Sequence, residues 1–152
     1  GRDCQRELAE RFIEVLGDRG SIFVYSSFEK TRVNELCRDY PDLERDLKNI
    51  TNRFVDLLTI VSKHAYHLDF KGSFSIKKVL PAFVKDLSYD DIDVRDGDTA
   101  VARFAKMARG EYTQADFART QSELLKYCGL DTLAMVRLHY RLTQLASESG
   151  SS

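Results

Sequence analysis

Glu29 stands where an apolar segment gives way to a predicted helix. Residues 21–25 carry no charge and are rich in β-branched and aromatic side chains, which predicts a strand buried on both faces. The carboxyl edge of a sheet is where α/β proteins collect ligands and catalytic groups. Glu29 is therefore a candidate catalytic or ligand-binding residue. The alternative is an acidic residue in the first turn of a helix, where the helix dipole favours it.

Asp131 is a second candidate, because it lies in the middle of an apolar stripe on the last predicted helix. A buried carboxylate is costly unless it is paired, hydrogen-bonded or bound to a metal. Tyr127 lies one helical turn earlier, so its phenol projects beside that carboxylate. The alternative is that Gly129 ends one helix and Asp131 caps the next. At 100° per residue, the stripe within about 60° of Asp131 contains Leu124, Tyr127, Cys128, Ala134, Met135, Leu138, Leu142 and Leu145.

Two neighbouring segments in the middle of the chain carry opposite charge. Residues 63–85 have five lysines against one aspartate, a net charge of +4, interleaved with three phenylalanines. Such a segment could follow a phosphate backbone and stack on bases. Residues 86–98 have six aspartates against one arginine, a net charge of −5. The candidates for nucleic-acid binding are Lys77, Lys78 and Phe74. The alternative is that the basic and the acidic segment are two solvated surface faces.

Neither the aspartate run nor the histidines predict a metal site. Counting from Asp91, the sixth position of a calcium loop is Asp96 rather than glycine, and the twelfth is Ala102 rather than glutamate. His64 and His67 have the spacing of metal ligands, but no third ligand is near in sequence, so a packing or surface role is favoured.

Composition excludes several classes of protein. The 152 residues have a net charge of −1, which argues against a globally basic nucleic-acid binder and against an acidic disordered chain. The three cysteines form no C-x-x-C pair, and no apolar run approaches the ~18 residues of a membrane span. With only 10 glycines and prolines, long helices are favoured over many-stranded folds. We expect a mostly helical cytoplasmic domain.

Hydrophobic periodicity predicts six or seven helices and one strand. The helices include residues 5–17, 42–63, 99–109 and a long one that ends near residue 146. The strand covers about residues 21–26, and segments 66–70 and 91–94 are weaker strand candidates. A strand buried on both faces needs neighbours for its backbone groups, so we expect an incomplete sheet. The expected organisation is one domain over residues 1–146, followed by a disordered tail at 147–152.

Several of these segments, in this order, resemble the DEDD 3′-5′ exonucleases of the ribonuclease H-like superfamily. The hydrophobic run that ends in Ser26, Ser27, Phe28 and Glu29 resembles their second motif, and Tyr127-x-x-x-Asp131 resembles the third motif of the tyrosine subgroup. Residues 55–58 and 73–81 are similar to the segments between those motifs. Over about residues 8–145, the chain looks most like an uncharacterised bacterial domain of unknown function that often forms the C-terminal part of larger proteins.

The resemblance implies a ribonuclease H-like α/β fold and phosphodiester hydrolysis in nucleic acid. Such enzymes hold two Mg²⁺ or Mn²⁺ ions ~3.5–4 Å apart with four carboxylates. By the resemblance, Glu29 and Asp131 supply two carboxylates, and Tyr127 orients the nucleophilic water. Lys77 and Lys78 would serve the phosphates.

Two departures from the exonuclease pattern qualify this expectation. Glu29 replaces the usual aspartate, and the first motif, Asp-x-Glu on a strand, is missing. The D-x-E at Asp42 and Glu44 follows a proline at a helix start, where the two carboxylates diverge by about 200°. We therefore expect that this fragment alone binds metal weakly and is inactive. The rest of its own chain or a second copy would complete the sheet.

Two other functions stay open at this point. One is a non-catalytic helical module of the same ancestry that binds nucleic acid or protein. The other is a structural helical domain whose motif matches arise by chance. An upstream strand with Asp-x-Glu would favour the nuclease, and its loss would favour the binding module.

Overall fold

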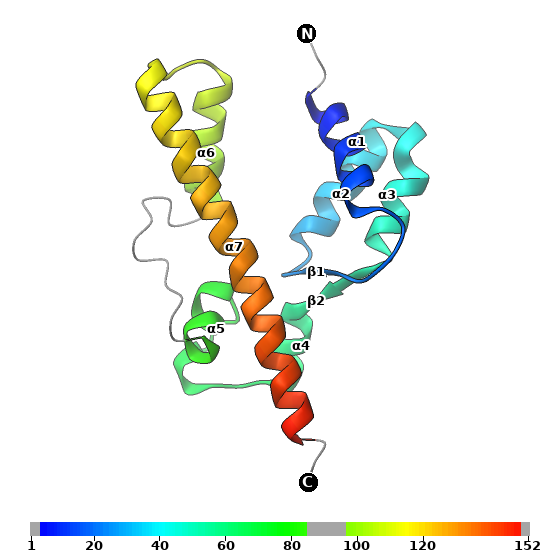
Figure 1. Cartoon of the computed structure of the whole chain (residues 1–152), viewed down its shortest axis with the longest axis vertical. Helices are drawn as coiled ribbons and strands as arrows, with labels where there is room; N and C mark the ends of the chain where they lie inside the picture. The colour runs from blue at the N-terminus through cyan, green and yellow to red at the C-terminus, as the bar shows by residue number, and fades with distance from the viewer. Residues whose placement is uncertain (1–3, 85–96, 150–152) are drawn as a thin grey trace. The chain divides into compact units, whose positions relative to one another are not determined.

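A computed structural model describes residues 4–84 and 97–149. The chain divides into two compact units, Gly1–Tyr66 and His67–Ser152. Within the described ranges there are seven α-helices and a two-stranded parallel sheet, so the prediction of a mostly helical chain is confirmed (Figure 1). The sequence predicted one domain over residues 1–146 and a tail at 147–152, whereas α7 continues to Ser149.

The first unit places a short parallel sheet between helices. Ile22 is in register with Phe54, and Val24 with Asp56. Its core is a cluster of Val33, Cys37 and Leu47, packed by partly buried neighbours that include residues of α1 and α2. The elements of this unit are α1 (Cys4–Leu16), β1 (Ile22–Val24), α2 (Phe28–Asp39), the 3-10 helix η1 (Pro41–Leu43), α3 (Glu44–Thr51), β2 (Phe54–Asp56) and α4 (Leu57–His64).

The long helix predicted over residues 42–63 is wrong, because β2 interrupts it. The backbone N–H of Ile22 donates to the carbonyl of Arg53 at 2.9 Å, which draws this segment into the sheet. Leu47, Ile50 and Leu57 are all buried, and their spacing of three and seven residues is also typical of one unbroken helix. The periodicity therefore continued across a strand of three residues and concealed it.

The predicted strand at about 21–26 is confirmed as β1, although it has only three residues. Within the described residues its partner is β2, which was not among the weak strand candidates. Residues 68–70 of the first candidate form the 3-10 helix η2 (Leu68–Phe70). The second candidate, residues 91–94, lies outside the described residues.

The second unit is built around one long helix. α5 (Ile76–Phe83) and α6 (Gly97–Ala108) both pack against α7 (Gln114–Ser149), as Figure 1 shows. Leu80, Val84 and Ala134 form the buried contact between α5 and α7. An ion pair between Arg103 and Glu123, both largely shielded from solvent, joins α6 to α7.

α7 runs through Gly129 without a break. The alternative in which Gly129 ends one helix and Asp131 caps the next is therefore wrong. None of the helices in the described residues combines the length and apolarity that a membrane crossing requires.

Candidate functional site

The carboxyl ends of β1 and β2 meet at one edge of the sheet, because the two strands are parallel. β1 ends at Val24, and the chain turns through Tyr25 and Ser26 before α2 begins at Phe28. β2 ends at Asp56, which caps α4 by accepting a hydrogen bond from the Leu58 N–H. The edge therefore carries two carboxylates, since Glu29 lies in the first turn of α2.

Glu29 is half-buried. Its Oε2 is shielded from solvent and has no hydrogen-bond partner among the described residues. Burial raises the pKa of this carboxyl, and the nearby charge of Asp56 raises it further. Hydrogen bonds from the backbone N–H groups of Glu29 and Tyr25 act in the opposite direction on that pKa. Perturbed pKa values cluster at functional sites. A buried polar atom without a hydrogen-bond partner calls for an explanation, such as a catalytic role or a bound ion.

Asp56 also affects the tyrosine at the end of β1. Burial, followed by the charge of Asp56, raises the pKa of Tyr25 to about 12. Tyr25 therefore keeps its phenolic proton at neutral pH.

Asp56 was not among the site residues predicted from the sequence. One signal was present, because an aspartate directly before an apolar helical run is a typical N-cap. Its proximity to Glu29 could not be inferred while β2 was taken for helix.

We expect Glu29→Gln to increase the free energy of unfolding at pH 7. The pKa of Glu29 is raised in the folded state, so the stability tied to its proton is lost as pH rises through that folded pKa. The amide of the glutamine variant stays neutral at every pH, so the variant does not lose this stability as pH rises. The gain should disappear below about pH 4, where glutamate is protonated in both states. Denaturant unfolding at the two pH values measures the effect.

The matched control is Glu35→Gln on the same helix, because Glu35 is paired with Arg32 at 2.9 Å. No gain at pH 7 is expected from this variant. Equal stabilisation by the two variants would show that the burial of Glu29 has no such cost.

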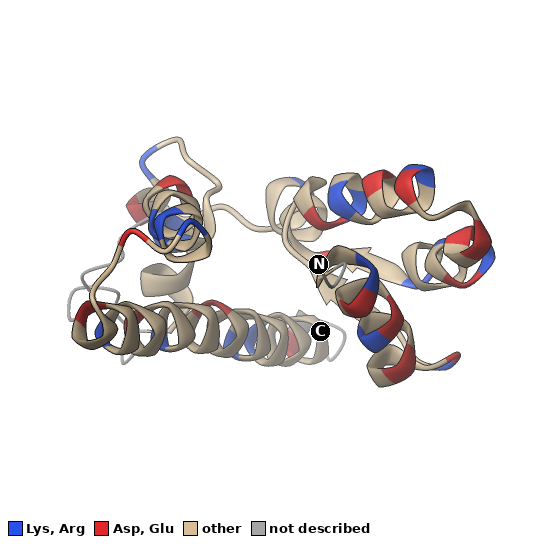
Figure 2. Ribbon diagram, turned by 90° about the horizontal axis from the view of Figure 1, so that it is seen from above, with Lys and Arg blue, Asp and Glu red and all other residues tan. Residues whose placement is uncertain are grey.

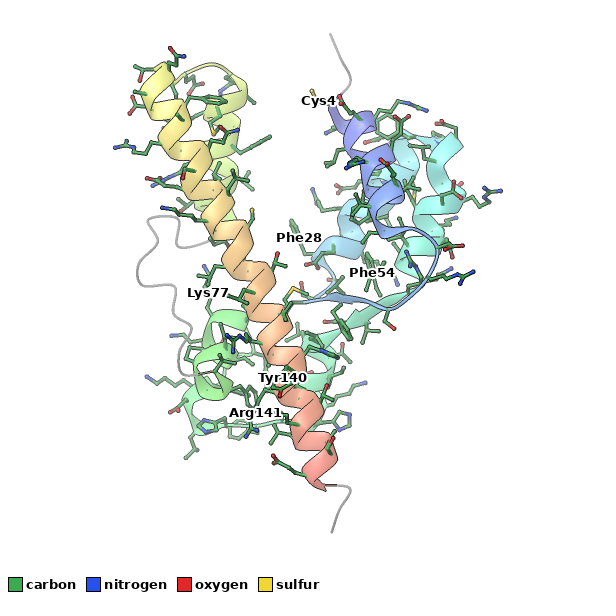
Figure 3. The ribbon with its side chains drawn as sticks, viewed as in Figure 1. Cys4, Phe28, Phe54, Lys77, Tyr140 and Arg141 are labelled. Carbon is green, nitrogen blue, oxygen red and sulfur yellow. The ribbon has the colours of Figure 1, made fainter. Side chains whose placement is uncertain are left out.

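The second set of candidate residues lies in the unit of residues 67–152. Tyr127 is buried on α7 and Asp131, one turn later, is half-buried, as the predicted stripe requires. Cys128, which was predicted to belong to that stripe, is exposed. The Nζ of Lys77 lies 5.4 Å from the centroid of the Tyr127 ring, a cation–π contact. Figure 3 shows Lys77 on α5 beside α7. The structure thus brings together Lys77, which was predicted to bind phosphate groups, and Tyr127, which was predicted to orient water.

The other two basic-segment candidates differ in their surroundings. Lys78 is exposed to solvent. Phe74 is half-buried, and its ring meets that of Phe70 edge-on at 5.8 Å between centroids. Phe74 therefore takes part in packing, and its stacking on a base stays a prediction.

Glu29 belongs to the first unit, whereas Tyr127, Asp131 and Lys77 belong to the second. Whether Glu29 and Asp131 share a metal stays a prediction. Among the residues that the structure describes, no three His, Cys, Asp or Glu side chains are grouped as a metal site. Both signs of charge are interspersed along the helices (Figure 2).

Comparison with known proteins shows that the first half of the chain is similar to a family of domains. Residues 1–75 match the family described as Domain of unknown function (DUF2779). The chain is also 34% identical over 139 residues to the uncharacterized protein MG366 homolog of Mycoplasma pneumoniae. This match covers 80% of the chain but only 20% of the relative, so the chain spans about a fifth of that protein. No solved structure matches the chain.

Proposed function

We propose that the DUF2779 domain in residues 1–75, together with the helices that follow it, forms part of a two-metal-ion 3′-5′ exonuclease of the ribonuclease H-like type. The observation that carries this proposal is Glu29. It occupies the carboxyl edge of a parallel sheet, and its buried Oε2 has no hydrogen-bond donor among the residues that the structure describes. A carboxylate oxygen in that condition suits a hard divalent cation, which prefers oxygen ligands.

Each candidate residue has a distinct role in this proposal. Glu29 and Asp131 hold divalent cations, Mg²⁺ or Mn²⁺, through their carboxylates. Such ions, when bound as a pair, supply an activated hydroxide and stabilise the leaving 3′ oxygen. Tyr127 orients the attacking water, and Lys77 and Lys78 bind phosphate oxygens of the nucleic acid.

Two carboxylates do not complete such a centre, so the 152-residue chain alone is proposed to be inactive. The partners are nucleic acid and whatever completes the sheet, either another part of the same protein or a second copy. Support for a completing partner comes from the strands, since β1 and β2 have three residues each and sheets of this size depend on further pairing or packing. We place this nuclease in the bacterial cytoplasm.

A non-catalytic helical module that binds nucleic acid or protein is the second candidate function. It is favoured by large apolar side chains that are exposed on α6 and α7. Phe104 is 65% exposed, Leu125 68% and Tyr140 63%. Exposed apolar groups of this size are typical of interaction surfaces when they are contiguous.

The proposal is tested by titrating Mn²⁺ into the ¹⁵N-labelled 152-residue chain and following the loss of amide signals by NMR. We expect paramagnetic broadening around Glu29, reversed by excess Mg²⁺ and abolished by Glu29→Gln. Glu35→Gln on the same helix should leave it unchanged. Broadening that is equal in both variants would overturn the proposal.

A nuclease assay on end-labelled single-stranded DNA and RNA tests the second half of the proposal. No hydrolysis is expected from the 152-residue chain at millimolar Mg²⁺ or Mn²⁺. Robust Mg²⁺-dependent hydrolysis would show that this chain is sufficient for catalysis, contrary to the proposal.

A further inference from the structure

Asp56 joins three parts of the first unit through one carboxylate. Its Oδ1 accepts hydrogen bonds from the backbone N–H of Leu58 and from that of Ser26, each at 2.9 Å. Its Oδ2 accepts one from the Thr59 hydroxyl at 3.0 Å. The bonds to Leu58 and Thr59 are those of an ordinary helix N-cap. The bond to Ser26 is different, because it reaches 30 residues back to the end of β1.

Ser26 lies in the turn that follows β1, two residues after the strand ends at Val24. Its φ of +89° lies in the left-handed region, which a residue with a Cβ adopts only at a cost in free energy. Asp56 holds the N–H of Ser26, and the Oγ of Ser26 accepts a hydrogen bond from the Phe28 N–H at 3.3 Å. The surrounding structure therefore stabilises an unfavourable backbone conformation at this position.

The conformation of Ser26 determines where Glu29 lies. In the part of the chain that the structure describes, the side chain of Ser27, the N-cap residue of α2, makes no cap hydrogen bond. The entry into α2 is thus fixed from Ser26, and Glu29 follows only three residues later. The backbone of Tyr25, on the other side of the turn, lowers the pKa of the Glu29 carboxyl, so both sides of the turn act on this side chain.

We propose that Asp56 is a positioning residue for Glu29, acting through its hydrogen bond to the backbone of Ser26. This inference rests on the proposed role of Glu29 as a metal ligand. Asp56 does not bind the cation in this account. It holds the β1–α2 turn in a strained form that sets Glu29 at the sheet edge before a cation arrives, which is the usual task of residues that support a site.

The experiment separates the two roles of Asp56. Asp56→Ser keeps a hydroxyl that can cap α4 but is too short to reach Ser26. Thr59→Val, the matched control, removes one bond to Asp56 and leaves Ser26 untouched. Asp56→Asn keeps an acceptor oxygen in place without the charge. Mn²⁺ affinity at Glu29 is measured by amide broadening in the 152-residue chain, and hydrogen exchange of the Ser26 amide is measured without metal.

We expect Asp56→Ser to weaken Mn²⁺ binding at Glu29 at least tenfold and to accelerate exchange of the Ser26 amide. Thr59→Val should change the affinity less than twofold, and Asp56→Asn should stay within about threefold of the wild type. Adding Ser26→Gly to Asp56→Ser should restore most of the affinity, because glycine adopts a positive φ without the steric cost. If Asp56 only capped α4, Ser26→Gly would not restore the Mn²⁺ affinity, because it does not replace the lost cap.

Three results would overturn the inference. One is an affinity within twofold of the wild type in Asp56→Ser, another is an equal loss in Thr59→Val, and the third is no rescue by Ser26→Gly. Failure of the proposed function looks different, because the wild-type chain would then show no Mn²⁺ effect at Glu29. Even in that case, the exchange rate of the Ser26 amide tests whether the hydrogen bond from Ser26 to Asp56 stabilises the β1–α2 turn.

Discussion

Phe70→Ala is expected to lower the free energy of unfolding of the unit of residues 67–152 by about 3–5 kcal/mol, the usual cost of emptying a buried aromatic site. Phe70 is completely buried in η2, and its ring meets that of Phe83 edge-on at 5.6 Å between centroids. Phe74 packs on the same ring. Removal of Phe70 therefore leaves a cavity beneath α5, the helix that carries Lys77.

The effect is measured by denaturant unfolding, with amide signals of α5 and α7 as the probes for this unit. Leu68→Ala provides the control within the same 3-10 helix, since Leu68 is 82% exposed. A change below about 0.5 kcal/mol is expected there, as for most surface positions. A similar loss in both variants would show that Phe70 is not the core of this unit.

Arg53→Met is expected to lower the free energy of unfolding of the first unit by about 2–3 kcal/mol, because hydrogen bonds of a charged group contribute ~1.5–3 kcal/mol and these bonds are lost together. The guanidinium donates to backbone carbonyls at the end of α1 and in the loop that follows it. Nη2 contacts the carbonyls of Leu16 at 3.1 Å and Gly17 at 2.8 Å, and Nη1 contacts those of Arg19 and Gly20.

These contacts connect the end of α1 to β2. Gly17 and Gly20 both have positive φ values, so the loop between α1 and β1 turns sharply, and Arg53 fills its inside. Lysine cannot reproduce the planar fork, so Arg53→Lys should lose much of the same stability. Arg19→Met is the control, because that side chain is 95% exposed. Unfolding of the first unit in denaturant distinguishes the variants, and equal midpoints for Arg53→Met and Arg19→Met would contradict the prediction.

The candidate residues on α7 were the most predictable part of the molecule. An α-helix repeats every 3.6 residues, so the apolar stripe around Asp131 and the neighbouring position of Tyr127 followed from spacing alone. β1 was also identifiable, because an uncharged run of β-branched and aromatic residues has few other interpretations.

The sheet partner of β1 could not be predicted in the same way. β2 has three residues, less than two periods of strand alternation, and it lies between helices whose buried positions continue the same spacing. The hydrogen bond from Ser26 to Asp56 joins residues 30 positions apart, so no local pattern indicates it. The cation–π contact of Lys77 with Tyr127 likewise depends on the packing of two helices that are distant in sequence.

The unbroken course of α7 has a mechanical consequence. Thirty-six residues at 1.5 Å each make a rod about 54 Å long. The ion pair between Arg103 and Glu123 connects α6 to the N-terminal part of α7. α5 packs against α7 around Ala134. A displacement at the α6 end is therefore transmitted along α7. Tyr127 and Asp131 move together, because one continuous helix keeps the distance between them constant.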